Sequence, residues 1–310
     1  MMDELKVFDD DTTSNTYEKV REFSKVEVVD DEISIGRKMT PELKIEDHKK
    51  DCKKWNIHVD DTQAYLPFMY WVPKMHKKPS KQRFIAASAR CSTKQLSAAI
   101  TKCLKVIDRH YECAAKKRYS CCGINSYWII GNSSKVHKMI ADSNARKNVE
   151  NIATYDFSTL YAYIPHHKLK ERMAKVISDA YEGDGRKYIS VYTSGASFVN
   201  NPKSTTKAYT KEQLIDMVNY LIDNCYVTCG DSLFRQKIGI PMGTDCAPFL
   251  ANLFLFSYEN EWMMRMKQTD PHLARQFSNS VRYIDDLLTI NNDGLIKKTH
   301  ECLDTMLSKN

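Results

Sequence analysis

Two adjacent aspartates, Asp285 and Asp286, lie in the middle of a stretch of β-forming residues at 281–290. This pattern predicts a β-hairpin that carries two carboxylates at its tip. Like charges at such short range raise each other's pKa and destabilise the turn, so we expect a bound cation there. A third carboxylate, Asp156, lies in another predicted strand, 152–157. If that strand lies beside the hairpin, the three carboxylates can hold two divalent ions about 3.5 to 4 Å apart, as in two-metal phosphoryl transfer.

The alternative for Asp285 and Asp286 is an ordinary solvated turn, because aspartate is common in turns for reasons that need no bound ion. The pair alone does not decide between a turn and a metal site. The order of the sequence motifs around it, described below, favours the metal site.

The composition is that of a globular protein. The chain has 310 residues, 42% of them hydrophobic and 27% charged, which allows a sizeable core and roughly two domains. The longest apolar stretch, residues 249–256, is too short to span a bilayer, and the first residues lack a charged and apolar leader. We therefore expect an intracellular protein, nuclear or cytoplasmic, that is neither secreted nor inserted in a membrane.

The ten cysteines are scattered along the chain without a Cys-x-x-Cys pair, so free thiols in a reducing compartment are expected. A zinc site is poorly supported by the spacing of possible ligands. The best candidates are His110, Cys113, Cys121 and Cys122, and the adjacent last pair fits tetrahedral ligation badly.

Charge is divided unevenly along the sequence. Residues 1–61 carry 11 basic and 17 acidic side chains, residues 62–150 carry 17 and 4, and residues 151–310 carry 18 and 18. The net charge of +7 therefore depends on the central block. Such an asymmetry is typical of a polyanion-binding surface, and nucleic acid is the natural partner. The alternative is a solvated basic face without a ligand.

Hydrophobic periodicity and turn residues predict a mixed order of strands and helices. The first 61 residues lack sustained periodicity and are expected to form an acidic, partly disordered arm. Hairpins are expected at 66–87, 188–199 and 226–240. Helices are expected at 95–107, after Pro165, after the capping-box pattern of Thr210 and Gln213, and at 248–264.

Five segments occur in the order found in reverse transcriptases. They are residues 70–79 (YWVPKMHKKP), 83–94 (RFIAASARCSTK), 155–161 (YDFSTLY), 238–248 (IGIPMGTDCAP) and 282–288 (RYIDDLL). Each segment alone is a weak signal, but five in sequence over residues 65–292 form a highly specific pattern. The chain therefore resembles the reverse transcriptases of Penelope-like retroelements, which are similar to telomerase catalytic subunits.

The resemblance implies an α+β fold made of the fingers and palm of a right-hand polymerase, with an antiparallel palm sheet packed on helices. Residues 1–61 would be the N-terminal arm, residues 62–150 the basic fingers and residues 151–310 the incomplete palm, with the thumb absent. The implied partners are an RNA template, a DNA primer and deoxynucleoside triphosphates. The implied cofactors are two Mg²⁺ ions, with Mn²⁺ as a substitute.

The resemblance also implies roles for individual residues. Asp156, Asp285 and Asp286 would be the catalytic carboxylates and, with Phe157, the metal ligands. Tyr161 would be the steric gate, an aromatic ring in the space that a ribonucleotide 2′-hydroxyl needs. From the sequence alone, a core aromatic is the alternative for Tyr161.

Further matched positions would contact the nucleotide. The positions that grip the incoming triphosphate would be Arg83, Lys74 and Lys81, with Phe157 and Tyr161 beside them. The turn beneath the nascent base pair would be Pro241, Met242 and Gly243, where glycine lets the backbone approach the nucleotide.

The basic block would contact the nucleic-acid backbone through Lys77, Lys78, Lys102, Lys105 and Arg109. The aromatic residues Tyr70, Trp71 and Trp128 are candidates for stacking on bases, but aromatic residues in strand-like segments more often belong to the core.

The sequence departs from the family in three respects. It ends at Asn310, before the expected lysine-bearing segment, primer grip and thumb, so we expect a truncated copy. Lys297, Lys298 and Lys309 fall in no motif that equates one of them with the family's general-acid lysine. Asp245 stands where an uncharged Asn is expected and adds negative charge near the nucleotide.

The leading hypothesis is an RNA-directed DNA polymerase core that adds deoxynucleotides to a primer 3′-hydroxyl by two-metal phosphoryl transfer. The alternative is a catalytically impaired retroelement remnant that only binds nucleic acid. An RNA-templated RNA polymerase is disfavoured, because Tyr161 would obstruct a ribose 2′-hydroxyl.

Overall fold

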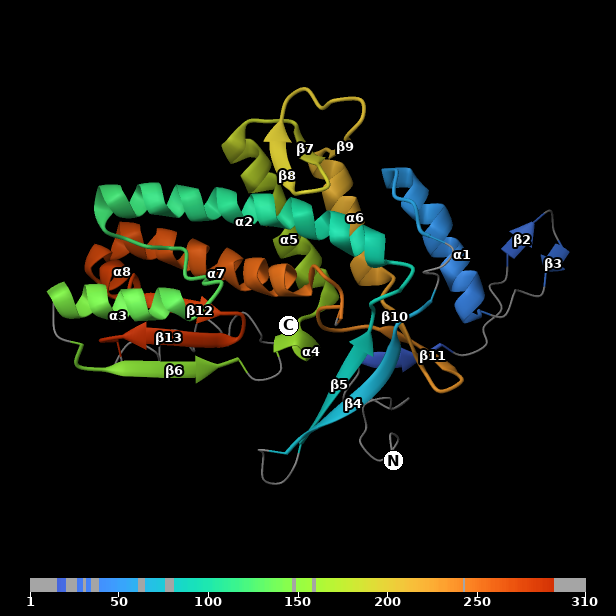
Figure 1. Cartoon of the computed structure of the whole chain (residues 1–310), viewed down its shortest axis with the longest axis horizontal. Coiled ribbons are helices and arrows are strands. Elements are labelled where there is room, and N and C mark those ends of the chain that lie inside the picture. The colour runs from blue at the N-terminus through green and yellow to red at the C-terminus, as the bar shows by residue number, and fades with distance from the viewer. Residues whose placement is uncertain are drawn as a thin grey trace.

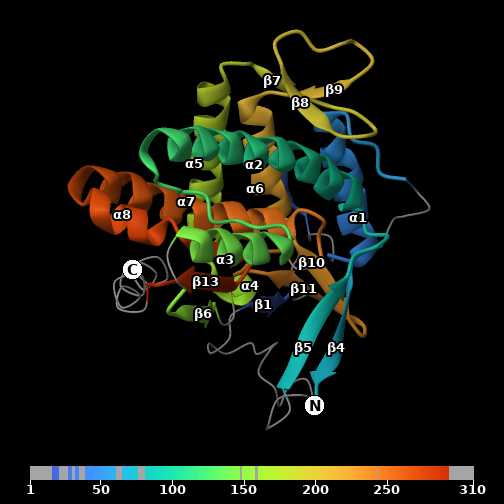
Figure 2. The same cartoon turned by 60° about the vertical axis from the view of Figure 1, so that its left-hand side comes forward.

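The computed structural model describes residues 16–20, 27–29, 32–34, 39–60, 65–75, 81–146, 149–157, 160–241 and 243–292. These residues form a mixed α+β fold in which a group of helices adjoins several small sheets. Figures 1 and 2 show the layers in the same order: α2 (Lys94–Cys122), then α7 (Ala247–Thr269), then strands β13 (Asp286–Ile290) and β6 (Ile152–Asp156).

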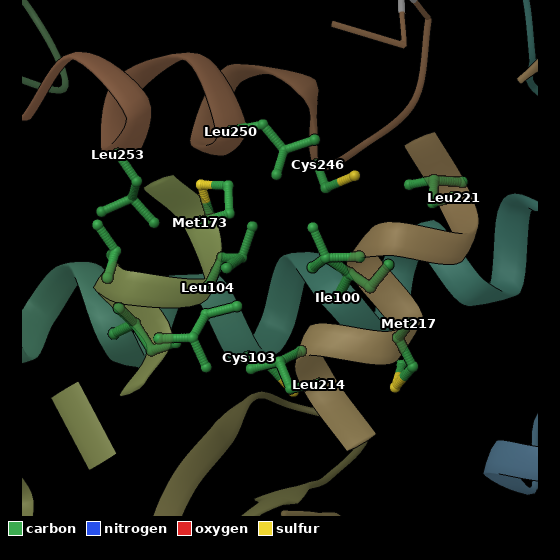
Figure 3. Packing of buried hydrophobic residues seen from close by; sticks show 14 of the residues in the cluster. Ile100, Cys103, Leu104, Met173, Leu214, Met217, Leu221, Cys246, Leu250 and Leu253 are labelled. Carbon is green, nitrogen blue, oxygen red and sulfur yellow. The ribbon is translucent and has the colours of Figure 1, made fainter. Parts of the chain in front are cut away.

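The main hydrophobic core lies between α2, α5 (His166–Asp184), α6 (Lys211–Asp223) and α7. Figure 3 shows Leu104 of α2, Met173 of α5 and Leu250 of α7 converging there. The apolar stripe predicted for 95–107 is buried, but α2 continues to Cys122. The sequence pattern missed this extension because Ala115 is the only buried side chain that the helix contributes after Ile107.

The other predicted helices are confirmed. α5 follows Pro165, and α7 includes the predicted segment 248–264. α6 begins with the predicted capping box, in which the Gln213 backbone N donates to Thr210 Oγ1 at 3.3 Å and the Thr210 backbone N donates to Gln213 Oε1 at 3.0 Å. The remaining helical segments are α1 (Pro41–Cys52), η2 (Lys53–Trp55), α3 (Ser134–Arg146), α4 (Leu160–Tyr163) and α8 (Pro271–Phe277).

A five-stranded sheet has the order β1-β11-β10-β4-β5. Its strands are β1 (Tyr17–Lys19), β11 (Ser232–Gln236), β10 (Tyr226–Cys229), β4 (Phe68–Lys74) and β5 (Lys81–Ala87). The β4–β5 and β10–β11 pairs confirm two predicted hairpins, and the two hairpins meet through a parallel contact between β4 and β10. In both views the β4–β5 hairpin projects away from the helices (Figures 1 and 2).

A second sheet has the antiparallel order β12-β13-β6, where β12 is Ser280–Tyr283. Leu287 of β13 packs with Trp128, Trp262 and Phe277 in a second hydrophobic cluster, which attaches this sheet to α7 and α8. The predicted hairpin at 188–199 is also confirmed. Its strands, β7 (Tyr188–Val191) and β8 (Ala196–Val199), join β9 (Lys207–Tyr209) in a separate sheet, and β2 (Glu27–Val29) pairs with β3 (Glu32–Ser34).

All three charge blocks of the sequence contribute residues to the main core. Trp55, Ile100 and Met217 come from the three blocks and belong to the same hydrophobic cluster. Within the predicted acidic, partly disordered arm, η2 carries Trp55 into that cluster and Tyr17 of β1 is only 3% exposed, so these two segments pack against the rest of the chain. A few large apolar side chains suffice to fix these segments even though their sequence is acidic and lacks periodicity.

No helix among the described residues is long and apolar enough to cross a bilayer. The zinc candidates His110, Cys113, Cys121 and Cys122 all lie along α2. Within the described ranges, no three His, Cys, Asp or Glu side chains are grouped so that they could hold a metal ion.

Candidate functional site

The β12–β13 connection, residues 283–286, carries the adjacent aspartates and is called the carboxylate turn below. β12 ends at Tyr283 and β13 begins at Asp286, so the turn residues are Ile284 and Asp285. The predicted tip, Asp285 and Asp286, is thus displaced by one residue, and Asp286 pairs with Tyr283 as a strand residue. In this turn Ile284 has a φ of +54°, in the left-handed region that β-branched residues rarely adopt.

Strand β6 lies beside β13, as the metal-site interpretation requires. Asp156 is directly opposite Asp286 in the antiparallel register. The backbone N of Phe157 donates to the carbonyl O of Asp285 at 2.9 Å. The strand pairing therefore places Asp156, Asp285 and Asp286 at the same end of the three-stranded sheet.

The electrostatics of the carboxylate turn favour a cation. Desolvation, followed by the negative charges of Asp285 and Asp156, raises the pKa of Asp286 above its ordinary value. Carboxylate oxygens are the ligands that Mg²⁺ and Mn²⁺ prefer, and a divalent ion would relieve the repulsion. The donor chemistry of Asp156, Asp285 and Asp286 therefore fits a hard divalent ion. Among the described residues, however, the side chains of these three aspartates are not grouped closely enough to form a metal-binding site.

Tyr161 on α4 lies near this turn. Its ring is half-buried against the main core, and its carbonyl O accepts a hydrogen bond from the Ile240 backbone N at 2.8 Å. Burial, followed by the negative charge of Asp285, raises the pKa of Tyr161 to about 12. Phe157 packs against both hydrophobic clusters, so its side chain is a core contact. Packing thus holds the Tyr161 ring close to the charge of Asp285.

Gly243, in the predicted nucleotide-contacting turn 241–243, packs against β5. Gly243 has a φ of +82°, and a Cβ atom on it would lie 2.2 Å from the carbonyl O of Ala86. Ser88 Oγ donates a hydrogen bond to the Gly243 carbonyl O. Glycine is therefore required here by the approach of β5, a reason that the sequence did not reveal.

Asp245 has a cationic partner. Lys94 Nζ, at the start of α2, lies 2.6 Å from Asp245 Oδ1, and about a third of each side chain is exposed. The extra negative charge noted in the sequence is therefore compensated within the chain. This ion pair connects the segment after Gly243 to α2.

The β4–β5 hairpin carries the predicted triphosphate-binding residues. In its register Arg83 lies opposite Val72, and Lys74 lies opposite Lys81. The side chains of Arg83, Lys74 and Lys81 lie outside the described part of the chain. So do the whole residues Lys77, Lys78, Met242, Lys297, Lys298 and Lys309.

Two of the predicted nucleic-acid contacts on α2 have partners within the chain. Lys102 Nζ donates to the carbonyl O atoms of Tyr192 at 2.7 Å and Thr193 at 3.2 Å. Lys105 Nζ lies 5.6 Å from the centre of the Phe249 ring. Arg109 is exposed on the same helix. The role of these three residues in binding nucleic acid stays a prediction.

The aromatic candidates for base stacking fall into two classes. Trp128 is only 2% exposed and stacks on Phe277 in the second hydrophobic cluster, so a base cannot reach it. Tyr70 and Trp71 on β4 are 40% and 41% exposed. The core alternative is therefore correct for Trp128, whereas the rings of Tyr70 and Trp71 are accessible.

Sequence reasoning missed an ion pair behind the carboxylate turn. Arg282 and Glu259 are almost fully buried, and Arg282 Nε lies 2.6 Å from Glu259 Oε1. The sequence did contain a signal for this pair, because Arg282 lies in an apolar strand segment and Glu259 in an apolar helix segment. Charged residues that become buried require partners.

The chain matches no protein-family model and no curated protein. Solved structures do match. Telomerase from Candida albicans, in complex with a TWJ fragment of telomeric RNA, aligns with a TM-score of 0.50 and 15% identity over 85% of this chain and 44% of that one. Apo telomerase from Candida tropicalis, truncated from its C-terminal domain, aligns with a TM-score of 0.52 and 11% identity over 86% of this chain and 52% of that one.

This chain thus spans about half the length of the telomerase chains it matches. At such low identity the similarity establishes the fold alone. The fold is a mixed α+β one similar to that of the telomerase chains, which confirms the predicted α+β fold class. The Penelope-like type, the division into fingers and palm, and the missing thumb stay predictions.

Proposed function

We propose that this chain is the core of an RNA-directed DNA polymerase that adds deoxynucleotides to a primer 3′-hydroxyl. The observation that supports it most is the position of Asp156 opposite Asp286 and near Asp285 in a telomerase-like fold. Carboxylates that converge at one end of a sheet suit two-metal phosphoryl transfer. On the resemblance of its motifs, we assign the enzyme to the Penelope-like type and to the nucleus or cytoplasm.

In this proposal each group near the carboxylate turn has a defined task. Asp156, Asp285 and Asp286 would hold two Mg²⁺ ions, which when bound activate the primer hydroxyl and neutralise the triphosphate. The ring of Tyr161 would exclude a ribonucleotide 2′-hydroxyl. Arg83 would bind the triphosphate from the β4–β5 hairpin. The RNA template and DNA primer would lie along the basic block of residues 62–150.

Primer extension on an RNA template with Mg²⁺ tests the proposal. Asp285→Ala and Asp156→Ala should each reduce extension by about a hundredfold or more, because each removes a ligand from the ions that stabilise the developing charge. The matched control is Asp231→Ala, which changes an exposed aspartate in the β10–β11 turn. RNA affinity should stay the same in all three variants. Equal extension by wild type and the Asp285 variant would refute the proposal.

A nucleic-acid-binding remnant without catalysis is the second candidate. It is favoured by the 17 basic against 4 acidic residues of the block 62–150, an excess that does not depend on the carboxylates. The same experiment separates the two functions. A remnant would bind RNA with an affinity that falls steeply with salt, yet would extend no primer under any metal condition.

A further inference from the structure

Directly behind the carboxylate turn lies a fully buried arginine. Arg282 on β12 faces Glu259 and Asn252, which both lie on α7. Its Nε and Nη2 atoms donate to the two carboxylate oxygens of Glu259 at 2.6 and 3.1 Å. Nη1 donates to Asn252 Oδ1 at 2.9 Å, and Nη2 also donates to the Asn252 carbonyl O at 3.1 Å. Arg282 is thus anchored to α7 by four hydrogen bonds.

The fifth hydrogen bond of the guanidinium reaches the turn itself. Arg282 Nη1 donates to the carbonyl O of Ile284 at 2.7 Å. Ile284 precedes Asp285 and has the left-handed φ of +54° described above. The orientation of its peptide group determines the direction in which the chain enters Asp285 and Asp286. Arg282 therefore bonds the peptide on which the placement of both carboxylates depends.

The backbone of Arg282 is equally restrained. Its N donates to the Trp128 carbonyl O at 2.7 Å, and its carbonyl O accepts from the Ile130 N at 2.9 Å. Both ends of the residue are therefore fixed, the backbone by the segment before α3 and the guanidinium by α7. Because Arg282 is fixed at both ends, its guanidinium can hold the Ile284 carbonyl in one defined position.

A contribution to the stability of the fold does not by itself explain why this buried network is present. Desolvation of two buried charges offsets much of their attraction, and apolar replacements of such pairs are often neutral or stabilising. A guanidinium, however, presents five N–H donors in a rigid planar fork, and here all five have acceptors. This arrangement fixes relative positions better than any apolar contact does.

We propose that Arg282 is a positioning residue: its guanidinium, anchored by Glu259 and Asn252, holds the Ile284 carbonyl and so keeps Asp285 and Asp286 at the sheet end of Asp156, where the three carboxylates can close on divalent ions. The inference rests on the proposed function, because it assigns the carboxylates to the divalent ions of that reaction. A purely structural ion pair between β12 and α7 is the competing explanation.

Two variants of the full chain separate these explanations. Arg282→Met combined with Glu259→Leu removes both charges and should keep the fold, because no charge is left unpaired. Arg282→Lys keeps a positive charge opposite Glu259, but its single ammonium lacks the planar fork that bonds Glu259 and Ile284 together. Glu261→Gln is the matched control on α7, since Glu261 is exposed and pairs with Arg172 at 2.6 Å.

The first readout is Mn²⁺ binding followed by electron paramagnetic resonance, with circular dichroism to confirm folding. Both Arg282 variants should bind Mn²⁺ about 10- to 100-fold more weakly than wild type, the usual loss when a group that orients a metal ligand is removed. Glu261→Gln should bind normally. In primer extension, the Arg282 variants should need more Mg²⁺ and lose kcat, while RNA affinity is unchanged.

The outcomes are distinct. If Asp285→Asn loses Mn²⁺ binding while a folded Arg282 variant keeps wild-type affinity and kcat, the positioning role is refuted and the proposed function stands. If Asp285→Asn itself binds Mn²⁺ like wild type, the carboxylates hold no metal, and both proposals are refuted. If the double variant fails to fold, Arg282→Lys decides, and its wild-type Mn²⁺ affinity would again refute the positioning role.

Discussion

Replacing Gly243 with alanine should destabilise the protein through one contact that the structure specifies. The new Cβ atom would lie 2.2 Å from the carbonyl O of Ala86 and 3.1 Å from Ser88 Oγ. The serine side chain can rotate, but the Ala86 carbonyl belongs to β5 and cannot move without disturbing its pairing with β4. The segment at Gly243 must therefore shift away from β5, which also breaks its hydrogen bond with Ser88.

The expected cost has two parts. At a φ of +82° an alanine is disfavoured by about 1 to 2 kcal/mol relative to glycine. The clash with β5 adds about 1 to 3 kcal/mol, the usual cost of forcing extra atoms into a packed site. Gly243→Ala should therefore lower the free energy of unfolding by about 2 to 5 kcal/mol, a large fraction of the total for a typical protein.

Gly185→Ala isolates the clash. Gly185 has a φ of +79°, almost the same as Gly243, but a Cβ atom on it would have no other atom within 4 Å. The control should lose only the backbone part, about 1 to 2 kcal/mol. Urea unfolding followed by circular dichroism measures both variants. Equal losses for Gly243→Ala and Gly185→Ala would show that the approach of β5 does not constrain residue 243.

Three further predictions concern single contacts. Tyr161→Ala should lower the preference for deoxynucleotides, measured as a ratio of kcat/KM values, more than it lowers deoxynucleotide turnover; unchanged selectivity would leave Tyr161 as a core aromatic. Lys94→Glu should destabilise the protein by about 1 kcal/mol, and adding Asp245→Lys should recover most of that loss in a double-mutant cycle; additive losses would show that the pair is uncoupled. Burial lowers the pKa of His48 from 6.5 to about 4, so the unfolded chain takes up the proton first as pH falls. The free energy of unfolding should thus fall by about 2 kcal/mol more between pH 7 and 5 in wild type than in His48→Gln, and equal slopes would contradict this.

Local elements were predictable because their determinants lie close together in the sequence. The capping box of Thr210 and Gln213 and the proline before α5 mark helix starts within a few residues. Hairpins with short turns, such as the one at Gly230, are equally local. The end of α2 was missed because its second half has almost no buried face, so hydrophobic periodicity ends before the helix does.

The carboxylate site was predictable only in part. The residue types at Asp156, Asp285 and Asp286 indicated a metal site, and the pairing of β6 with β13 was a condition that the structure met. The exact turn was missed because a β-branched residue at position 284 is normally a strand residue, whereas Ile284 is left-handed here. A hydrogen bond from Arg282 Nη1 to the Ile284 carbonyl O, made by a guanidinium that α7 holds in place, opposes the local preference.

Partners of charged residues were the least predictable features. Asp245 and Lys94 are 151 positions apart, and Arg282 and Glu259 are 23 apart on different elements. No local pattern connects either pair. The isolated charge of Asp245 in the sequence therefore suggested repulsion near the nucleotide, whereas the folded chain neutralises it with an ion pair to α2.

The segment 238–246 connects the two halves of the proposed site. The Gly243→Ala variant should therefore affect activity as well as stability. At its start, the Ile240 N donates to the carbonyl O of Tyr161, whose ring lies near Asp285. Three residues later, Gly243 touches β5, the strand on which Arg83 lies. A shift of this segment away from β5 therefore disturbs its hydrogen bond with Tyr161 and changes the position of the Tyr161 ring relative to Asp285. Nucleotide affinity should consequently fall in Gly243→Ala beyond what reduced stability explains, whereas Gly185→Ala, at the distant end of α5, should keep it.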